Sequence, residues 1–301
     1  MKTNLKGIIV PVVTPFDEKE RFMPDALGQI IDALIGQGVH AIFAIGSVGE
    51  FYALDESETI DVIKETVRAV RGRVPVLAGT GAIDTRRTVS LSRHAEEVGA
   101  DALSVLTPFY IQPNDDELLA HYSKVLQSVR IPVLGYTNPG RSGGVTISTR
   151  LARRLCDQHE NFSGLKDSSG NIVLLKEYKA ICPADFALFT GLDTIVYEAL
   201  LNGATGGVCG LANIAPQILV DIYNKTIAGD LAGARMQQEK VLKLRATYAF
   251  GTFPAVVKEA MNMLGLPAGC TRSPVGPLKP EARERLRQAL EEVLEIKIGQ
   301  N

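Results

Sequence analysis

Lys166 is the residue whose type and position point most directly to chemistry. It follows the apolar run 162–165, at the end of a predicted buried strand. Lysine is rarely buried without a specific role, and an amine attacks a carbonyl only in its neutral form, which burial favours. Lys166 is therefore a candidate nucleophile that forms a Schiff base with a carbonyl substrate. The structural alternative is a strand-end lysine paired with an acid such as Asp167.

Three more polar residues follow other predicted strands. Tyr136 ends the strand before that of Lys166, where a phenol relays protons while a carbinolamine collapses to an imine. Ser47 lies in a glycine-bounded turn, whose hydroxyl and N–H groups suit a small carboxylate. Arg141 lies in a glycine-rich loop and suits bidentate binding of a second carboxylate. The structural alternatives are a core-edge aromatic, a turn serine or helix N-cap, and a solvated arginine.

Other catalytic patterns are not found in the sequence. The four histidines lie on separate segments without ligand spacing, so no metal site is expected. A phosphate-binding GxxxxGK[ST] loop, a dinucleotide fingerprint and a serine-hydrolase motif are also missing. Glu50 and Asp193 could act as general acids or bases, although such residues are more often caps or ion-pair partners.

Short apolar runs, several of them continuous, indicate parallel strands buried on both faces. Eight such runs cover residues 8–13, 41–45, 74–78, 102–106, 132–135, 162–165, 186–189 and 207–211. Amphipathic stretches between them predict helices at 55–71, 84–99, 115–129, 147–159 and 194–202. Asp55 with Glu58 resembles a capping box, and Gly38, Gly99 and Gly203 each suit the end of a helix before a strand.

Eight strand–helix units in sequence predict a (β/α)8 TIM barrel over residues 1–229, with an open doubly wound sheet as the alternative. Further helical patterns at 215–228, 231–248, 253–264 and 280–296 follow. The first of these closes the barrel. The others predict a C-terminal helical extension over 230–301, packed on the barrel because no linker separates it.

The composition gives no sign of a nucleic-acid-binding, membrane-spanning or secreted protein. Hydrophobic residues make up 46% of 301, and the net charge is −2, which gives no reason to expect nucleic acid or an anionic membrane as partner. The N-terminal apolar run 7–13 is too short for a signal peptide or a membrane span. Cysteines without short spacing suit a cytoplasmic protein; they are Cys156, Cys182, Cys209 and Cys270.

Four motifs in order resemble the dihydrodipicolinate synthase / N-acetylneuraminate lyase family over nearly the full length. Residues 7–16 (GxxxPxxTPF) resemble its first strand, and 46–50 (GSVGE) its GxxGE carboxylate-binding turn. Tyr136 with Pro139 resembles its Y-N-x-P motif, and 164–170 (GLKDSSG) its Schiff-base lysine motif. The resemblance implies a class I, pyruvate-dependent aldolase or lyase that condenses pyruvate with an aldehyde, or releases one.

The resemblance also implies roles for individual residues. Lys166 would form the imine and Tyr136 would move protons, while Ser47 and the N–H groups of Ser47 and Val48 would hold the pyruvate carboxylate. Tyr110 would complete the hydroxyl relay from a neighbouring subunit, since family members are commonly dimers or dimers of dimers. A homo-oligomer, either a dimer or a homotetramer, is therefore expected. Val208 would pack against pyruvate, and Gly191 is a further substrate-contacting position. The imine chemistry requires no separate cofactor.

Departures from the family pattern leave the second substrate open. Val48 stands where threonine is usual, and Thr137 where asparagine is usual. Arg141 matches the arginine that dihydrodipicolinate synthases use for the carboxylate of the aldehyde. The segments 49–51 and 166–169 look more like the branch that cleaves 2-keto-3-deoxy sugar acids or 4-hydroxy-2-oxoglutarate. A 4-hydroxy-tetrahydrodipicolinate synthase and a catabolic aldolase both remain open, ahead of a neuraminate lyase, and so do a metal-dependent aldolase and an inactive binding barrel.

Overall fold

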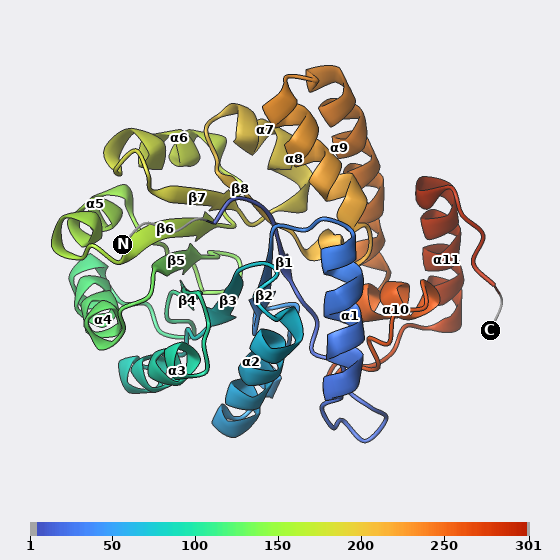
Figure 1. Cartoon of the computed structure of the whole chain (residues 1–301), viewed down its shortest axis with the longest axis horizontal. Coiled ribbons are helices and arrows are strands. Elements are labelled where there is room, and N and C mark those ends of the chain that lie inside the picture. The colour runs from blue at the N-terminus through green and yellow to red at the C-terminus, as the bar shows by residue number, and fades with distance from the viewer. Residues whose placement is uncertain (1–4, 300–301) are drawn as a thin grey trace.

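The fold is a closed barrel, seen in a computed structural model that describes residues 5–299. Within these residues, eight parallel strands pair in sequence order, and β8 closes the barrel on β1 (Figure 1). The predicted (β/α)8 class is confirmed and the open sheet is excluded. The strands are β1 (Gly7–Pro11), β2 (Ala41–Ala44), β3 (Val76–Gly79), β4 (Ala102–Leu106), β5 (Val133–Thr137), β6 (Phe162–Asp167), β7 (Ala187–Thr190) and β8 (Gly206–Val208).

A ring of helices covers the outside of the barrel (Figure 1). Its members are α1 (Pro24–Gly36), α2 (Glu56–Val70), α3 (Thr85–Glu97), α4 (Asp115–Ser128), α5 (Thr149–Gln158), α6 (Ile172–Ile181), α7 (Val196–Leu201) and α8 (Pro216–Ala228). The sequence patterns above do not single out α1 or α6. The capping box at the start of α2 is present, with Asp55 and Glu58 satisfying each other's backbone N–H. Gly38, Gly99 and Gly203 have positive φ after their helices, as expected.

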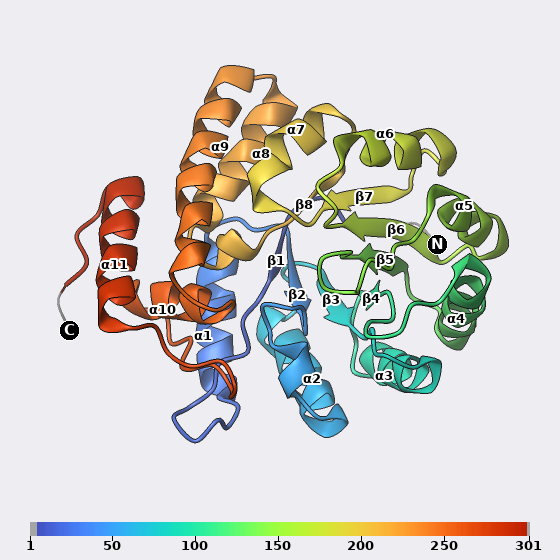
Figure 2. The same ribbon diagram turned by 180° about the vertical axis from the view of Figure 1, so that it is seen from behind.

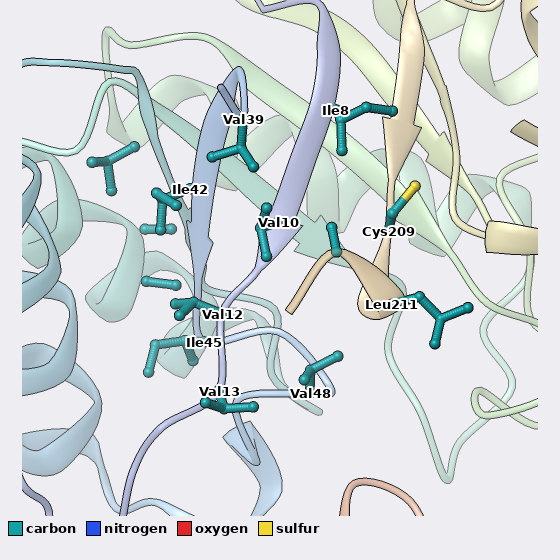
Figure 3. Close-up of a cluster of buried hydrophobic side chains, with 14 of the residues drawn as sticks. Ile8, Val10, Val12, Val13, Val39, Ile42, Ile45, Val48, Cys209 and Leu211 are labelled. Atoms are coloured by element: carbon teal, nitrogen blue, oxygen red, sulfur yellow. The ribbon is translucent and has the colours of Figure 1, made fainter. Parts of the chain in front are cut away.

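Two apolar layers hold the barrel together. The interior is filled by a small cluster of inward-facing side chains that includes Ile9, Phe43, Phe189 and Val208. A larger cluster lies between the strands and the surrounding helices, and Figure 3 shows part of it around β1, β2 and the chain after β8. The continuous apolar strands supply both layers, because alternate residues face inwards and outwards. The packed barrel therefore holds the side chains at the ends of its strands in fixed positions.

β5 and β6 end later, and β8 ends earlier, than the apolar runs in the sequence predict. β5 and β6 continue through Tyr136 and Lys166, which pair directly across the two strands, and Lys166 also pairs with Phe189 of β7. Both candidate catalytic residues are therefore inside strands, because the ladder continues after the apolar run stops. β8 is shorter than expected and ends at Val208. The chain then turns into a 3-10 segment, where the N–H of Leu211 donates to Asp193 instead of to a strand.

The C-terminal segment packs on the barrel next to α8. It consists of α9 (Leu231–Ala246), α10 (Ala255–Met263) and α11 (Pro280–Leu294), and α11 is the outermost of the three (Figure 2). α9 lies along α8 and also contacts the 3-10 segments Asp193–Ile195 and Gly210–Asn213, which follow β7 and β8. The predicted division after residue 229 falls in the turn between α8 and α9. The segment thus contacts the end of the barrel where the strands terminate.

Candidate active site

A cavity of about 710 Å³ opens at the carboxyl ends of the strands. This is the end at which barrels of this kind carry their active sites. Eight residues were given a catalytic or substrate-binding role in the resemblance, and seven of them line the cavity, whereas Tyr110 does not. The seven are Ser47, Val48, Tyr136, Arg141, Lys166, Gly191 and Val208. Whether each has the predicted role in catalysis or binding stays a prediction.

Lys166 rises from β6 into the bottom of this cavity. Its side chain is only 5% exposed, and its Nζ lies 3.8 Å from the centre of the Tyr136 ring and 5.0 Å from that of Phe43. Within residues 5–299 its Nζ forms no ion pair. Gly191 leaves room for it, since a Cβ there would lie 3.1 Å from the Cε of Lys166 and 2.0 Å from the Oγ of Ser168. The amine is thus enclosed by rings and has no counter-ion in contact.

The Tyr136 hydroxyl lies among polar groups from three strand ends. It accepts a hydrogen bond from Asn138 at 3.0 Å and interacts with Ser47 and Ser168. Burial by itself raises the pKa of this phenol. The positive charge on Lys166 and the hydrogen bonds from Asn138, Ser168 and Ser47 outweigh burial and lower the pKa to about 8. A phenol with this pKa can both donate and accept a proton near neutral pH.

The turn that carries Ser47 and Val48 is held in an unusual backbone conformation. Ile45, just before it, has a φ of +60°, which is strained for a β-branched residue. Gly49 leaves little room for a side chain, because a Cβ would lie 3.0 Å from the carbonyl oxygen of Val12. Val48 is 4% exposed and belongs to the outer apolar cluster, near Val13 and Leu211 (Figure 3). The valine therefore adds packing where a threonine would add a hydroxyl.

Glu50, at the end of this turn, connects it to the C-terminal segment through an ion pair and a hydrogen bond. It is fully buried, and its Oε1 forms an ion pair with Lys258 of α10 at 2.5 Å. Its Oε2 accepts a hydrogen bond from the backbone N–H of Arg272 at 3.0 Å. The structure thus favours the ion-pair interpretation of Glu50. The C-terminal segment therefore fixes the turn, although it lies far away in sequence.

Asp193 is the acid of the cavity. It follows β7, its Oδ1 accepts the N–H of Leu211 at 3.0 Å, and it is 6% exposed. Burial raises the pKa of its carboxyl to about 6, against the opposing effects of the Leu211 hydrogen bond and of the charges on Arg245 and Lys166. Because Asp193 accepts a backbone hydrogen bond and forms no ion pair with any described residue, it is a structural cap that retains the capacity to exchange a proton.

Tyr110 lies apart from the cavity. Its side chain is 93% exposed, and its φ of +74° is rare for a residue other than glycine. The ring therefore projects from the chain and reaches no group of this chain's own cavity. The predicted relay across a subunit boundary remains a prediction.

Several lining residues were not assigned roles from the sequence. Asn138 and Ser168 stand within the Tyr136 and Lys166 motifs, so their position in the motif was a usable signal. Arg245, Tyr248 and Phe253 belong to the C-terminal segment, and no local pattern indicates that this segment reaches the strand ends. The same holds for Lys258, the partner of Glu50.

Over residues 5–299, no group of three or more His, Cys, Asp or Glu side chains could hold a metal ion. In that range, too, no helix has both the length and the apolar character needed to cross a bilayer.

Comparison with known proteins gives a consistent result along nearly the whole chain. The family model described as "Dihydrodipicolinate synthetase family" matches residues 4–293. The chain is 36% identical to a 4-hydroxy-tetrahydrodipicolinate synthase of Pseudomonas syringae pv. syringae over 95% of this chain and 97% of the relative. It is 31% identical to one of Methanopyrus kandleri over 97% and 98%.

Solved structures agree with the fold and the family. The dihydrodipicolinate synthase of Aquifex aeolicus superposes with a TM-score of 0.94 at 31% identity, covering 98% of this chain and all of the other. A prophage protein of the dihydrodipicolinic acid synthase family from E. coli K12, solved in complex with pyruvate, superposes with a TM-score of 0.93 at 30% identity, covering 97% and 99%. This chain accordingly belongs to the dihydrodipicolinate synthetase family and is an enzyme of the Schiff-base pyruvate aldolase class.

Proposed function

We propose that this enzyme condenses pyruvate with an aldehyde through an imine on Lys166, in the manner of a 4-hydroxy-tetrahydrodipicolinate synthase. The observation that carries the proposal is a buried lysine that has no contacting counter-ion among residues 5–299. It pairs across two strands with a tyrosine whose pKa is lowered to about 8. Relatives that bear the synthase name over nearly the full length support the same reaction.

The residues around the cavity suggest a sequence of steps. The Nζ of Lys166 attacks C2 of pyruvate, and the carbinolamine loses water to give the imine. Loss of a proton from C3 gives an enamine, whose C3 bonds to the aldehyde carbon while the aldehyde oxygen takes up a proton. Water, or an amine on the second substrate, then displaces Lys166. Tyr136, whose hydroxyl interacts with the side chains of Ser47 and Ser168, carries the protons of these steps.

The carboxylate of pyruvate would occupy the turn after β2. The hydroxyl of Ser47 and the N–H groups of Ser47 and Val48 would hold it, with Val208 and Gly191 enclosing the methyl side. Arg141 would face the second substrate. The chemistry needs neither a metal nor a separate cofactor, so activity in excess chelator should equal that without it.

Quaternary structure and location complete the proposal. The exposed Tyr110 would enter the site of a second copy of this chain, which makes a dimer or a homotetramer the working form. Cysteines left free within the described residues suit a protein of the cytoplasm.

A catabolic aldolase is the second candidate. Val48 removes a hydroxyl from the carboxylate turn, and the buried Asp193 offers a carboxyl group to hydroxyls of a sugar acid. Cleavage of 2-keto-3-deoxy sugar acids or 4-hydroxy-2-oxoglutarate would use the same imine in reverse, and N-acetylneuraminate fits less well. An assay of synthesis and of cleavage on this set of compounds separates the candidates.

Borohydride trapping tests the shared mechanism. Reduction in the presence of pyruvate should attach one pyruvate-derived group to Lys166, which peptide mass analysis locates. Lys166→Ala should carry no adduct, whereas Lys124→Met, which removes an exposed lysine of α4, should still be labelled on Lys166. An adduct on a different lysine, or none in the wild-type protein, would reject the proposed function.

A further inference from the structure

Two of the four cysteines meet between neighbouring helices of the outer ring. Cys156 lies in the last turn of α5, and Cys182 is the residue at which α6 ends. Both are free thiols, and the thiol of Cys156 donates a hydrogen bond to the sulfur of Cys182. Neither residue lines the cavity that contains Lys166, and the proposed function uses neither. The pair is therefore a cluster of reactive groups without an assigned role.

The chain beside this contact is held in place by further hydrogen bonds. Arg153, one helical turn before Cys156, donates from its Nη1 to the carbonyl oxygen of Ile181 at 3.0 Å. The backbone N–H of Cys182 donates to the carbonyl oxygen of Tyr178 at 2.9 Å and so closes the last turn of α6. These bonds hold the end of α6 against α5. The two sulfurs therefore meet in the folded protein without a rearrangement of either helix.

The two thiols differ in their tendency to ionise. The hydrogen bond from Cys156 lowers the pKa of Cys182, and the positive charges of Arg153 and Lys179 act in the same direction against the effect of burial. The pKa of Cys156 is raised by the same hydrogen bond, by burial and by the charge on Cys182. The thiolate is the reactive form of cysteine. Cys182 is therefore the nucleophile of the pair.

The pair borders on solvent through one of its members. Cys182 is only 8% exposed, whereas Cys156 is partly exposed. The oxidation of a cysteine depends on its thiolate character and on its access to the oxidant. A small, uncharged oxidant such as hydrogen peroxide suits this position better than a bulky disulfide does.

We propose that Cys156 and Cys182 form a peroxide-sensitive dithiol, which closes to a reversible disulfide that cross-links α5 to α6. The two helices lie side by side next to β6 (Figure 1), and the segment 156–182 contains the whole of β6 with Lys166. Both cysteines lie at helix ends that lead into the starts of β6 and β7. The cross-link is thus at the end of the barrel opposite the cavity, where it stabilises the fold and leaves the active site open.

The reaction balances with hydrogen peroxide as the oxidant. The Cys182 thiolate attacks a peroxide oxygen, so an S–O bond forms, the O–O bond breaks, and the departing hydroxide takes the proton of the Cys156 thiol. The Cys156 sulfur then attacks the sulfur of the resulting sulfenic acid, which forms the S–S bond and breaks the S–O bond. The second hydroxide takes up the proton that Cys182 lost on ionising. Two thiols thus lose two electrons, and peroxide is reduced to two waters.

Counting thiols tests the cross-link. The chain has four cysteines, and alkylation in urea should label all four in the reduced protein. After the folded protein has been treated with hydrogen peroxide and the excess removed, two should be labelled, and dithiothreitol should restore four. Mass analysis of an unreduced digest should find the peptides of Cys156 and Cys182 joined, with the loss of two hydrogen atoms.

Variants assign a role to each sulfur. Cys156→Ser keeps a donor beside Cys182 but removes the second thiol, so peroxide should leave a sulfenic acid on Cys182 that dimedone labels. Cys182→Ser removes the thiolate, and dimedone should then leave Cys156 unlabelled. Cys270→Ser is the matched control, because a serine hydroxyl can still donate to the carbonyl oxygen of Asp17. This variant should form the cross-link as the wild type does.

The cross-link should also change thermal stability. Closing the segment 156–182 restricts the unfolded chain, so the oxidised protein should unfold at a Tm roughly 5 °C above that of the reduced protein. The difference should vanish in Cys156→Ala. That position is the more exposed of the two, so this variant tests the bond even if a change at the buried Cys182 prevents folding.

Several outcomes would overturn the proposal. Four thiols in the peroxide-treated protein, a disulfide between two molecules, or a joined pair that forms only after unfolding would each reject it. Equal Tm values for the oxidised and reduced proteins would reject the stabilising role. None of these measurements uses the catalytic reaction, so they leave the proposed function unaffected.

Discussion

Two lysines are buried among residues 5–299, and their surroundings differ in one respect. Lys166 in β6 is 5% exposed and Lys258 in α10 is 1% exposed, and each Nζ lies near an aromatic ring, that of Tyr136 or of Phe16. Lys258 has the Glu50 carboxylate at 2.5 Å and donates to the carbonyl oxygen of Cys270 at 2.6 Å. Lys166 forms no ion pair within residues 5–299.

The difference shows that burial by itself does not mark a catalytic lysine. Removing an amine from water disfavours its charged form, and a carboxylate in contact restores it. At Lys258 burial lowers the pKa, while the charge of Glu50 and its hydrogen bond act in the opposite direction. Lys258 with its partner holds two segments together, whereas Lys166 lies in a cavity where a carbonyl compound can reach it. The missing partner is therefore the distinguishing feature of Lys166.

The largest expected effect comes from removing the unpaired amine. Lys166→Met should abolish turnover, because no other group can form the imine. The same change should leave the free energy of unfolding unaltered or slightly higher, since an uncompensated polar group leaves a buried position. Steady-state assays and urea unfolding measure the two effects. Lost stability together with lost activity would mean that Lys166 is structural, like Lys258.

The ring beneath Lys166 carries the next effect. Tyr136→Phe keeps the aromatic surface and removes the proton carrier, so we expect turnover to fall by about 10²–10⁴-fold with the fold intact. The wild-type rate should also change with pH near 8, the pKa of this phenol, and that inflection should vanish in the variant. Turnover close to wild type would show that Tyr136, like Phe16 beside Lys258, contributes only packing.

Removing the partner of Lys258 should lower the stability of the fold. Glu50→Gln leaves Lys258 buried without its counter-ion, which should lower the free energy of unfolding by about 3–5 kcal/mol. The double variant Glu50→Gln/Lys258→Met removes both charges and should recover much of the loss. Chemical denaturation of the single and double variants gives the coupling. If the double variant is no more stable than the single one, the pair is not what holds the turn.

The smallest expected effect is at Asp193, a buried acid that forms no ion pair within the part of the chain that the structure describes. The folded protein holds its proton up to about pH 6, whereas the unfolded chain releases it near 3.8. Its contribution to stability is therefore greatest at low pH and is lost as pH rises from about 4 to 6. Asp193→Asn should raise stability by about 1–3 kcal/mol at pH 8 and have little effect at pH 4. Urea unfolding at both values measures this, and a larger gain at pH 4 would contradict it.

Local patterns predicted most of the barrel. The eight apolar runs correspond to the eight strands, and the capping residues Asp55 and Glu58 do what their spacing suggested. Strand ends were predicted less well. Tyr136 and Lys166 belong to the ladder, because backbone pairing continues after side chains change from apolar to polar. β8 is short because the chain after it leaves the sheet, and the N–H of Leu211 donates a hydrogen bond to Asp193 in the loop after β7.

By itself, the sequence determined the fold class and the candidate nucleophile, since strand period and motif order are properties of neighbouring residues. Only the tertiary structure decided what surrounds them. Glu50 meets Lys258, and Arg245 enters the cavity, because the C-terminal segment packs against the strand ends. Such contacts depend on the shapes of two surfaces formed by residues far apart in the chain. No local period encodes them, so the distinction between a paired and an unpaired lysine appears only after the chain has folded.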